Sequence, residues 1–240
     1  MPTYPRCRAI LCHGALLRLA VALSVGFLTA SCASRRLAVI GPIRDAAGSA
    51  RGLERRTELV EPIRIDFSWQ LNEAGSRLSG VGVARVEPPA RARLDLFLAN
   101  GETVITAALV ESDLRLPYGS RDDILPPVDL IWATLGVFRP VGDAELVGGD
   151  RLEGGQERLR YELIDGTELH YEVAAGTLRS VELLKSDHVV QWVRVTGSDD
   201  GRYPQEATYR NLAAFRELKI MRDSLKQVEP FDPRIWDPRE

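Results

Sequence analysis

The feature that most constrains this chain is a series of short segments in which apolar and polar residues alternate. In the first of them, residues 63–71, every second residue is apolar, which is the period of a half-buried β-strand. Similar segments recur at short intervals, whereas neighbouring parallel strands would need crossovers of about a dozen residues or more. The pattern predicts a mainly β chain with a few helices (α+β), built on one open, strongly curved antiparallel β-barrel of about 10 to 11 strands.

Turn residues indicate where these strands pair. Asn100-Gly101 and Asp165-Gly166 favour tight hairpins, because both positions of such a turn tolerate a positive φ. Ala74-Gly75 and Pro88-Pro89 mark further turns. The expected strands are 63–71, 78–86, 91–98, 104–110, a short one at 114–117, 158–164, 167–173, 178–184, 188–196, 206–211 and 215–228.

Two segments have helical character instead. Apolar residues between 43 and 56 keep an approximate helical spacing, which predicts one amphipathic helix. Residues 128–138 are strongly apolar, follow Pro127 and reach Gly136 near their end, a pattern typical of a short helix. A single apolar helix between strands must pack on the concave face of the sheet or cover its mouth, so we expect a lid or plug.

The N-terminus has the pattern of a targeting segment. Residues 1–31 carry three arginines and no acid, and include an apolar stretch from Leu19 to Leu28. This stretch is shorter than the roughly 20 residues that span a bilayer, which favours a signal peptide over a transmembrane helix. The predicted organisation is a signal peptide at 1–31, a lipidated N-terminus and tether at 32–42, a barrel domain at 43–228 and an extended C-terminal tail at 229–240.

Cys32 is the predicted lipid anchor. Ala30 and Ser31 directly before it resemble a bacterial lipobox, although Thr29 stands where that pattern prefers Leu, Val or Ile. The alternative is an ordinary secretory cleavage nearby that leaves a free thiol. No cysteine follows Cys32, which favours lipidation. Because Ala33 is not the aspartate that retains enterobacterial lipoproteins at the inner membrane, the resemblance implies the periplasm-facing side of the bacterial outer membrane.

Composition and motifs exclude several other functions. A formal net charge of -3 argues against nucleic-acid binding. The chain contains no nucleophile elbow, zinc-type histidine motif or phosphate-binding loop, so we expect no enzyme and no cofactor besides the lipid on Cys32. His170 and His188 have no cysteine or second close ligand beside them, so we expect no metal. An envelope hydrolase is the weakest of the hypotheses that we weigh.

Several segments together are similar to the LolA/LolB family of periplasmic lipoprotein carriers and outer-membrane lipoprotein receptors. They are the strand at 65–69, the Gly80-x-Gly82 strand, the segment from Pro88 to Leu96, the Asn100-Gly101 hairpin and the helix at 127–138. The similarity extends from about residue 63 to about residue 195, is closer to the LolB-like proteins, and depends on the order of the motifs. It implies an unclosed barrel of eleven strands whose apolar concave side, closed by helices, receives acyl chains.

Lipid binding needs apolar walls rather than directional chemistry, since each buried methylene contributes about 0.8 kcal/mol. We expect a cavity of several hundred Å³ beneath the helix around Trp132, whose lining residues would be Phe67, Trp69, Leu94, Leu96, Trp132, Leu135, Phe138 and Trp192. The expected partners are membrane lipids or lipoprotein acyl chains, and a periplasmic carrier protein. The alternative is a structural or assembly lipoprotein that uses the fold as a protein-docking platform, with a filled interior and its 231–236 tail folded against another chain.

Overall fold

The computed structural model describes residues 37–197 and 203–239. The predicted signal peptide and Cys32 lie outside this part. From Ala38 onward the chain forms one compact unit. Its described residues build one sheet of 13 strands in the order β1-β7-β8-β9-β10-β11-β12-β13-β2-β3-β4-β5-β6, and all neighbours are antiparallel.

The strands are β1 (Val39–Pro42), β2 (Ile63–Glu73), β3 (Ser76–Glu87), β4 (Arg91–Leu98), β5 (Thr103–Val110), β6 (Asp113–Arg115), β7 (Glu145–Leu152), β8 (Gln156–Glu162), β9 (Glu168–Ala174), β10 (Thr177–Lys185), β11 (His188–Thr196), β12 (Glu206–Asn211) and β13 (Arg216–Gln227). The α-helices are α2 (Ala46–Thr57) and α3 (Val128–Thr134). Three single turns of 3₁₀ helix are η1 (Asp122–Ile124), η2 (Glu153–Gly155) and η3 (Pro233–Trp236).

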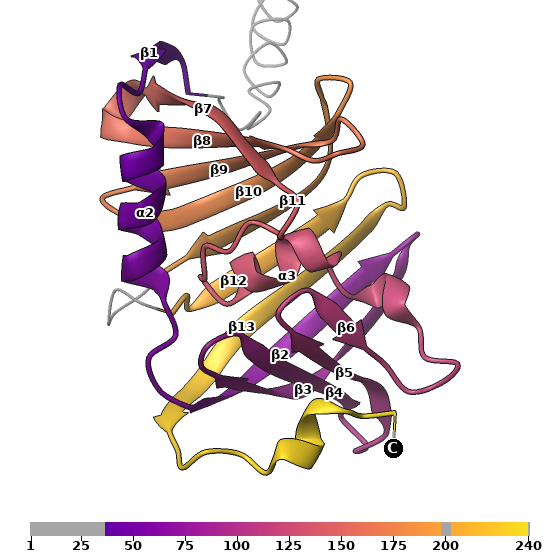
Figure 1. The fold of residues 1–240 in the computed structure, drawn as a ribbon. Coiled ribbons are helices and arrows are strands. Elements are labelled where there is room, and N and C mark those ends of the chain that lie inside the picture. Colours follow the sequence, from indigo (N-terminus) through magenta and orange to yellow (C-terminus); the bar gives the residue numbers. More distant parts are fainter. Residues whose placement is uncertain (1–36, 198–202, 240) are drawn as a thin grey trace, which may run out of the picture. The chain divides into compact units, whose positions relative to one another are not determined.

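Two antiparallel meanders make up the sheet, together with β1, which pairs with β7 at one edge. One contains β2 to β6 and the other contains β7 to β13, and they join where β13 pairs with β2. Between the meanders the chain passes from β6 at one edge through α3 to β7, the strand next to the other edge. Both α-helices lie over the same face of the curled sheet (Figure 1). The predicted open, curved antiparallel barrel with helical cover is therefore confirmed.

A row of apolar side chains crosses the concave face from one meander to the other. It is formed by register neighbours that are all buried: Leu71, Leu218, Tyr209, Val193, Val181 and Tyr171. Side chains alternate between the two faces of a strand, so the polar residues between these positions point outward. This alternation is the sequence pattern that predicted the strands.

Two strands, β1 and β7, come in addition to the eleven expected. In β7 the Gly148-Gly149 pair has the composition of a turn, yet it lies inside a strand. A Cβ added at Gly149 would lie 2.7 Å from Cδ1 of Ile43 and 3.0 Å from the carbonyl oxygen of Arg158. Close packing rather than a turn therefore requires glycine at this position.

The Gly80-x-Gly82 segment of β3 has a similar explanation. Phe67 pairs with Gly82 and Trp69 pairs with Gly80 across β2 and β3. A Cβ at Gly82 would lie 2.3 Å from the Phe67 ring, and one at Gly80 would lie 3.0 Å from the Trp69 ring. The two aromatic rings therefore lie over the glycines, and this fills the concave side of a strongly bent part of the sheet.

The C-terminal segment packs on the outer face of β4 and β5. Trp236 is only 3% exposed, and Ala108 of β5, on the outer face, is fully buried. Arg93 Nη1 donates to the Ile235 carbonyl at 2.9 Å, and Arg115 Nη1 donates to the Trp236 carbonyl at 3.1 Å. The predicted extended tail is thus held against the sheet of its own chain.

Candidate functional site

Helix α3 fills much of the concave face. It begins after Pro127 and ends in a Schellman motif, in which Gly136, at φ 75°, donates to Ala133 and Val137 donates to Trp132. The left-handed residue ends the helix at Thr134, so it is shorter than the predicted 128–138. Burial around this helix is nearly complete, with Ile131 at 0% and Trp132 at 1% exposure.

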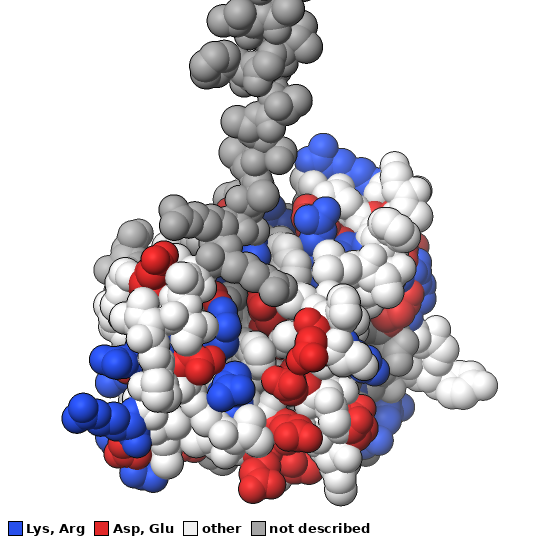
Figure 2. All heavy atoms as spheres, turned by 90° about the horizontal axis from the view of Figure 1, so that it is seen from above, with Lys and Arg blue, Asp and Glu red and all other residues white. Residues whose placement is uncertain are grey.

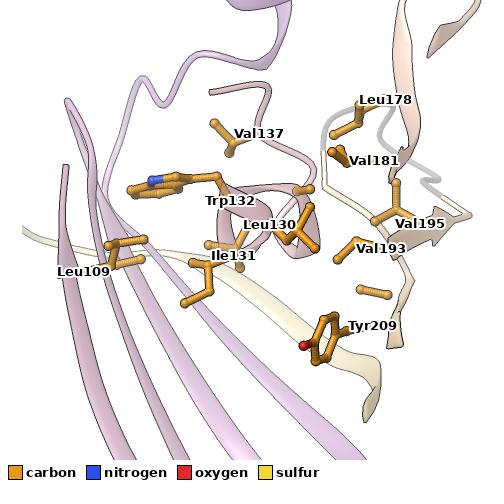
Figure 3. Packing of buried hydrophobic residues seen from close by; sticks show 14 of the residues in the cluster. Leu109, Leu130, Ile131, Trp132, Val137, Leu178, Val181, Val193, Val195 and Tyr209 are labelled. Atoms are coloured by element: carbon orange, nitrogen blue, oxygen red, sulfur yellow. The ribbon is translucent and has the colours of Figure 1, made fainter. Parts of the chain in front are cut away.

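The side chains of α3 reach both meanders. Leu130 points toward Val181 and Val193, and Trp132 points the opposite way, toward Leu109 (Figure 3). Trp132 Nε1 donates to the carbonyl of Glu111 at 3.1 Å. The space directly beneath the helix, where the sequence predicted a cavity, is therefore occupied by the helix's own side chains.

The segment after α3 contributes an aromatic cluster. The Phe138 ring meets the rings of Tyr171 and Tyr161 edge-on, with centroid distances of 4.9 and 6.0 Å. Its main-chain N–H donates to Thr57 Oγ1 of α2 at 3.0 Å, which joins the two helical segments. Burial raises the pKa of Tyr161 to about 12, so its hydroxyl stays neutral at physiological pH.

A cleft lies beside the C-terminal end of α3. Its space amounts to about 410 Å³, including the part that is open to solvent. The lining comes from β2, β3, β4, β12, β13, α3 and the segment before β12: Ile65, Phe67, Ala84, Leu94, Thr134, Leu135, Pro204, Gln205, Ala207, Ile220 and Arg222. Without counting the proline, seven of these eleven residues have purely hydrocarbon side chains. The cleft therefore offers an apolar wall with a few polar groups.

A second, smaller cleft of about 250 Å³ shares Pro204 with the first. It lies between the end of α3 and strands β10 and β11, and its lining includes Gly136, Leu178, Arg179 and Val195. Both clefts therefore flank the C-terminal end of α3.

The structure distributes the eight predicted cavity residues over several places. Phe67, Leu94 and Leu135 line the larger cleft together. The other five do not line it. Trp69 and Leu96 are buried in the core. Trp132 of α3 and Phe138, which follows α3, are buried in the same core, and Trp192 lies on β11.

Trp192 is on the outer face of the sheet. Its strand neighbour Val193 belongs to the buried concave row, and successive side chains of a strand point to opposite faces. The ring lies 4.5 Å below the guanidinium of the exposed Arg194. The position of Trp192 therefore gives no support to its predicted role in the cavity. The sequence alone had left open on which face of the strand Trp192 lies.

An ionic network fastens the segment that leads into α3. Arg216 forms ion pairs with Glu73 and with Asp123, the latter at 2.7 Å, and Arg121 contacts Asp123 at 3.0 Å. Hydrogen bonding from Arg216 lowers the pKa of Glu73, and that from Arg121 lowers the pKa of Asp123. Arg216 and Glu73 lie at the paired ends of β13 and β2, two positions from Leu218 and Leu71, so this network closes one end of the apolar face.

Asp129 is the charged residue of α3 itself. Burial raises the pKa of its carboxyl, and the nearby Asp143 and Asp165 raise it further. Among the described residues no group of histidine, cysteine, aspartate and glutamate side chains is arranged to hold a metal ion. Within the same part of the chain, no helix has the length and apolarity to cross a membrane.

Charge on the surface is mixed. On the face seen in Figure 2, acidic and basic side chains are interspersed, and the visible described residues form no continuous basic field. A continuous basic field is the usual footprint of a nucleic-acid interface. The chemistry that stands out is therefore the apolar space beside α3.

Solved structures with the same arrangement are known. A LolA superfamily protein from Nitrosomonas europaea superposes with a TM-score of 0.53 at 10% identity, covering 80% of this chain and 96% of that one. The chain has a LolA/LolB-like fold. A domain from Vibrio parahaemolyticus, described as an outer membrane lipoprotein-sorting protein, gives a TM-score of 0.52 at 10% identity and covers 79% of this chain and 94% of that one.

A DUF1329 family protein from Desulfovibrio piger has a TM-score of 0.50 at 11% identity, with coverage of 82% of this chain and 98% of that one. No protein-family model and no curated protein matches the sequence. At these identities the similarity shows the fold alone, and the function has to be argued from the site.

Proposed function

We propose that this protein is a lipid-anchored lipoprotein of the bacterial envelope that binds acyl chains of lipids or lipoproteins, with a LolB-like role in lipoprotein localisation at the periplasmic face of the outer membrane. The observation that carries the proposal is the apolar cleft beside α3, with Phe67, Leu94 and Leu135 in its lining. The fold agrees with it, because one of the similar structures is described as a lipoprotein-sorting domain.

The energetics favour a hydrocarbon ligand. Each methylene that leaves water contributes about 0.8 kcal/mol, so even half of a long acyl chain would bind usefully against this wall. The space of about 410 Å³ includes open solvent, so its enclosed part is smaller than ordinary ligand pockets, which span roughly 300 to 1,000 Å³. Enclosing a whole acyl chain therefore requires α3 to move, since Leu130 and Ile131 are fully buried against the sheet.

The anchor completes the proposal. Cys32 would carry the covalent lipid, and only residues 33–37 separate it from Ala38, where the compact unit begins. A fully extended segment of five residues reaches about 18 Å, so an acylated Cys32 would hold the folded unit close to the membrane. A periplasmic carrier protein that delivers acyl chains is the expected partner.

The cavity assignment is tested by Leu135→Arg, which places a charge in the cleft. Native mass spectrometry of the purified protein should show copurifying lipid with the wild type and none with Leu135→Arg. Val147→Arg is the matched control, because Val147 is an exposed apolar residue of β7 outside both clefts. Lipid that copurifies unchanged with a folded Leu135→Arg variant would show that the cleft is not the binding site.

The anchor has its own test. Cys32→Ser should shift the protein from the membrane fraction to the soluble periplasmic fraction, as followed by fractionation and immunoblotting. Membrane retention equal to that of the wild type would show that Cys32 is not the tether.

A docking platform is the second candidate, and the packing beneath α3 is the observation that favours it. A filled interior suits a protein that presents its surface to other proteins. The sequence suggested that the tail of such a platform folds against another chain. The position of the tail argues against this, because Trp236 is buried on the chain's own sheet. Absence of any bound lipid in the wild type would favour this candidate.

A further inference from the structure

We infer that a third cleft, on the Trp132 side of α3, binds a small zwitterion in which an ammonium group and an anion lie a few bonds apart. The head group of phosphatidylethanolamine and a free amino acid share this chemistry. The site is separate from the acyl cleft, so this inference goes beyond the proposed function and does not depend on it.

The third cleft lies between the turn that follows β5 and the segment that follows α3, on the side of the helix to which Trp132 points (Figure 3). Its space amounts to about 390 Å³, including the part that is open to solvent. The lining consists of Glu111, Ser112, Trp132, Arg139, Pro140, Val141 and Gly142. None of these residues lines either cleft beside the end of α3.

Arg139 supplies the positive charge of this cleft. Its guanidinium carbon lies 6.0 Å from the centre of the Trp132 ring, at the outer limit of a cation–π contact. A ring contact of this length leaves the N–H groups of the guanidinium without an acceptor. Within the described part of the chain the Arg139 side chain forms no ion pair and no hydrogen bond, so its donors remain available to a ligand.

Glu111 supplies the negative charge from a fixed position of the backbone. Its main-chain N–H donates to the Ala90 carbonyl at 2.8 Å, and its carbonyl accepts from Trp132 Nε1 at 3.1 Å. Its φ of 58° lies in the left-handed region, which glycine adopts more readily than glutamate. The turn itself therefore does not require a glutamate. Among the described residues the Glu111 carboxylate has no partner.

The two charges share one cleft, and within the described structure they form no ion pair with each other. A lone anion beside Arg139 would be repelled by Glu111, and a lone cation beside Glu111 would be repelled by Arg139. A zwitterion meets an opposite charge at each end. Ser112 adds a hydroxyl that can donate to the anion or accept from the ammonium group. The lining therefore favours a zwitterion over either ion alone.

The first experiment needs no variant. Nuclear magnetic resonance titration of the purified chain compares glycerophosphoethanolamine with its two halves, glycerophosphate and ethanolamine, and with alanine. The indole N–H resonance of Trp132 reports binding at this cleft. Hydrogen bonds to charged groups contribute enough for glycerophosphoethanolamine to bind about tenfold more tightly than either half. Tighter binding of glycerophosphoethanolamine than of alanine would identify a lipid head group as the source, and the reverse would identify an amino acid or a peptide end.

The second experiment assigns the two ends of the ligand. Glu111→Gln should weaken the binding of glycerophosphoethanolamine about tenfold, to the level of glycerophosphate, and Arg139→Gln should weaken it to the level of ethanolamine. Glu102→Gln and Arg77→Gln are the matched controls, because both residues are exposed and line none of the three clefts. Circular dichroism and thermal melting report whether each variant is folded.

The outcomes keep the two proposals apart. Zwitterions that bind the wild type no more tightly than glycerophosphate or ethanolamine would overturn this inference, as would complete absence of binding. Affinity that is unchanged in folded Glu111→Gln and Arg139→Gln variants would overturn it too. None of these results bears on the copurifying lipid that tests the acyl cleft, and loss of that lipid in Leu135→Arg leaves the zwitterion site untouched.

Discussion

Helix α3 and the C-terminal tail are two non-strand segments that pack on opposite faces of the same sheet, and they are held in different ways. The helix is held by apolar contacts on almost every side, with Ile131 and Trp132 inside the core. The tail is held by one aromatic anchor, Trp236, and by two arginines that donate to main-chain carbonyls.

The difference has a consequence for function. Apolar contacts have no direction, so an acyl chain could replace aliphatic side chains of α3 such as Leu130 and Ile131 without leaving polar groups unpaired, whereas displacing Trp132 would break its bond to the Glu111 carbonyl. The contacts of Arg93 and Arg115 with the tail are directional, and losing them would leave donors that water must satisfy. The inner face is thus suited to exchange one hydrocarbon for another, and the outer face to hold one fixed segment.

Removing the largest anchor of α3 should have the largest effect on stability. Trp132→Ala is expected to lower the free energy of unfolding by about 3 to 5 kcal/mol, because it leaves a cavity between the two meanders and removes the bond to Glu111. Urea denaturation followed by circular dichroism measures the change. Trp192→Ala on the outer face is the control and should cost much less; equal losses would mean that α3 is not the centre of the core.

The tail should give a smaller loss, because it can detach while the sheet stays folded. Trp236→Ala is expected to lower the free energy of unfolding by about 2 kcal/mol and to make the bond after Arg234 accessible to trypsin under native conditions. Limited proteolysis with mass spectrometry checks this. A tail that stays protected in the variant would show that the two arginines suffice to hold it.

The smallest predicted effect concerns Asp129, the acid on α3. Its pKa is raised in the folded state, so the folded chain binds this proton more tightly than the unfolded chain, and stability falls as the pH rises from the ordinary aspartate pKa through the raised one. Asp129→Asn should therefore stabilise the protein at neutral pH by about 0.5 kcal/mol, a small value because the group keeps part of its hydration.

The gain should disappear below the ordinary pKa of aspartate, where the wild-type carboxyl is protonated in both states. Thermal melts of both proteins across the acidic range provide the comparison. A constant difference at every pH would assign the effect to helix propensity or packing rather than to the charge.

The sequence predicted the features that depend on local chemistry. Hairpins form at Asn100-Gly101 and Asp165-Gly166 as expected, but in each pair the glycine alone has a positive φ. The lid helix was also found, since its apolar composition between prolines and glycine has no strand period. Strand β7 was missed because Gly149 is required by its close contact with Ile43, which is distant in sequence.

The candidate site was predicted only in part. Phe67, Leu94 and Leu135 meet in one cleft, but no periodicity tells which face of β11 carries Trp192. Arg222 was missed although a signal existed, because the alternation of Leu218 and Ile220 continues to it and places a cation on the apolar face. No sequence pattern indicated where the tail packs on the sheet. Arg93 and Arg115 donate to its main-chain carbonyls, which every residue has.

The central claim is that acyl chains bind in the cleft beside the end of α3. Photo-crosslinking with a fatty acid that carries a diazirine on its chain, followed by peptide mapping, tests it most directly. The account predicts labels on the lining residues of β2, β4 and α3, with Phe67, Leu94 and Leu135 foremost. Labels confined to the outer face, or none in the cleft under saturating ligand, would contradict it.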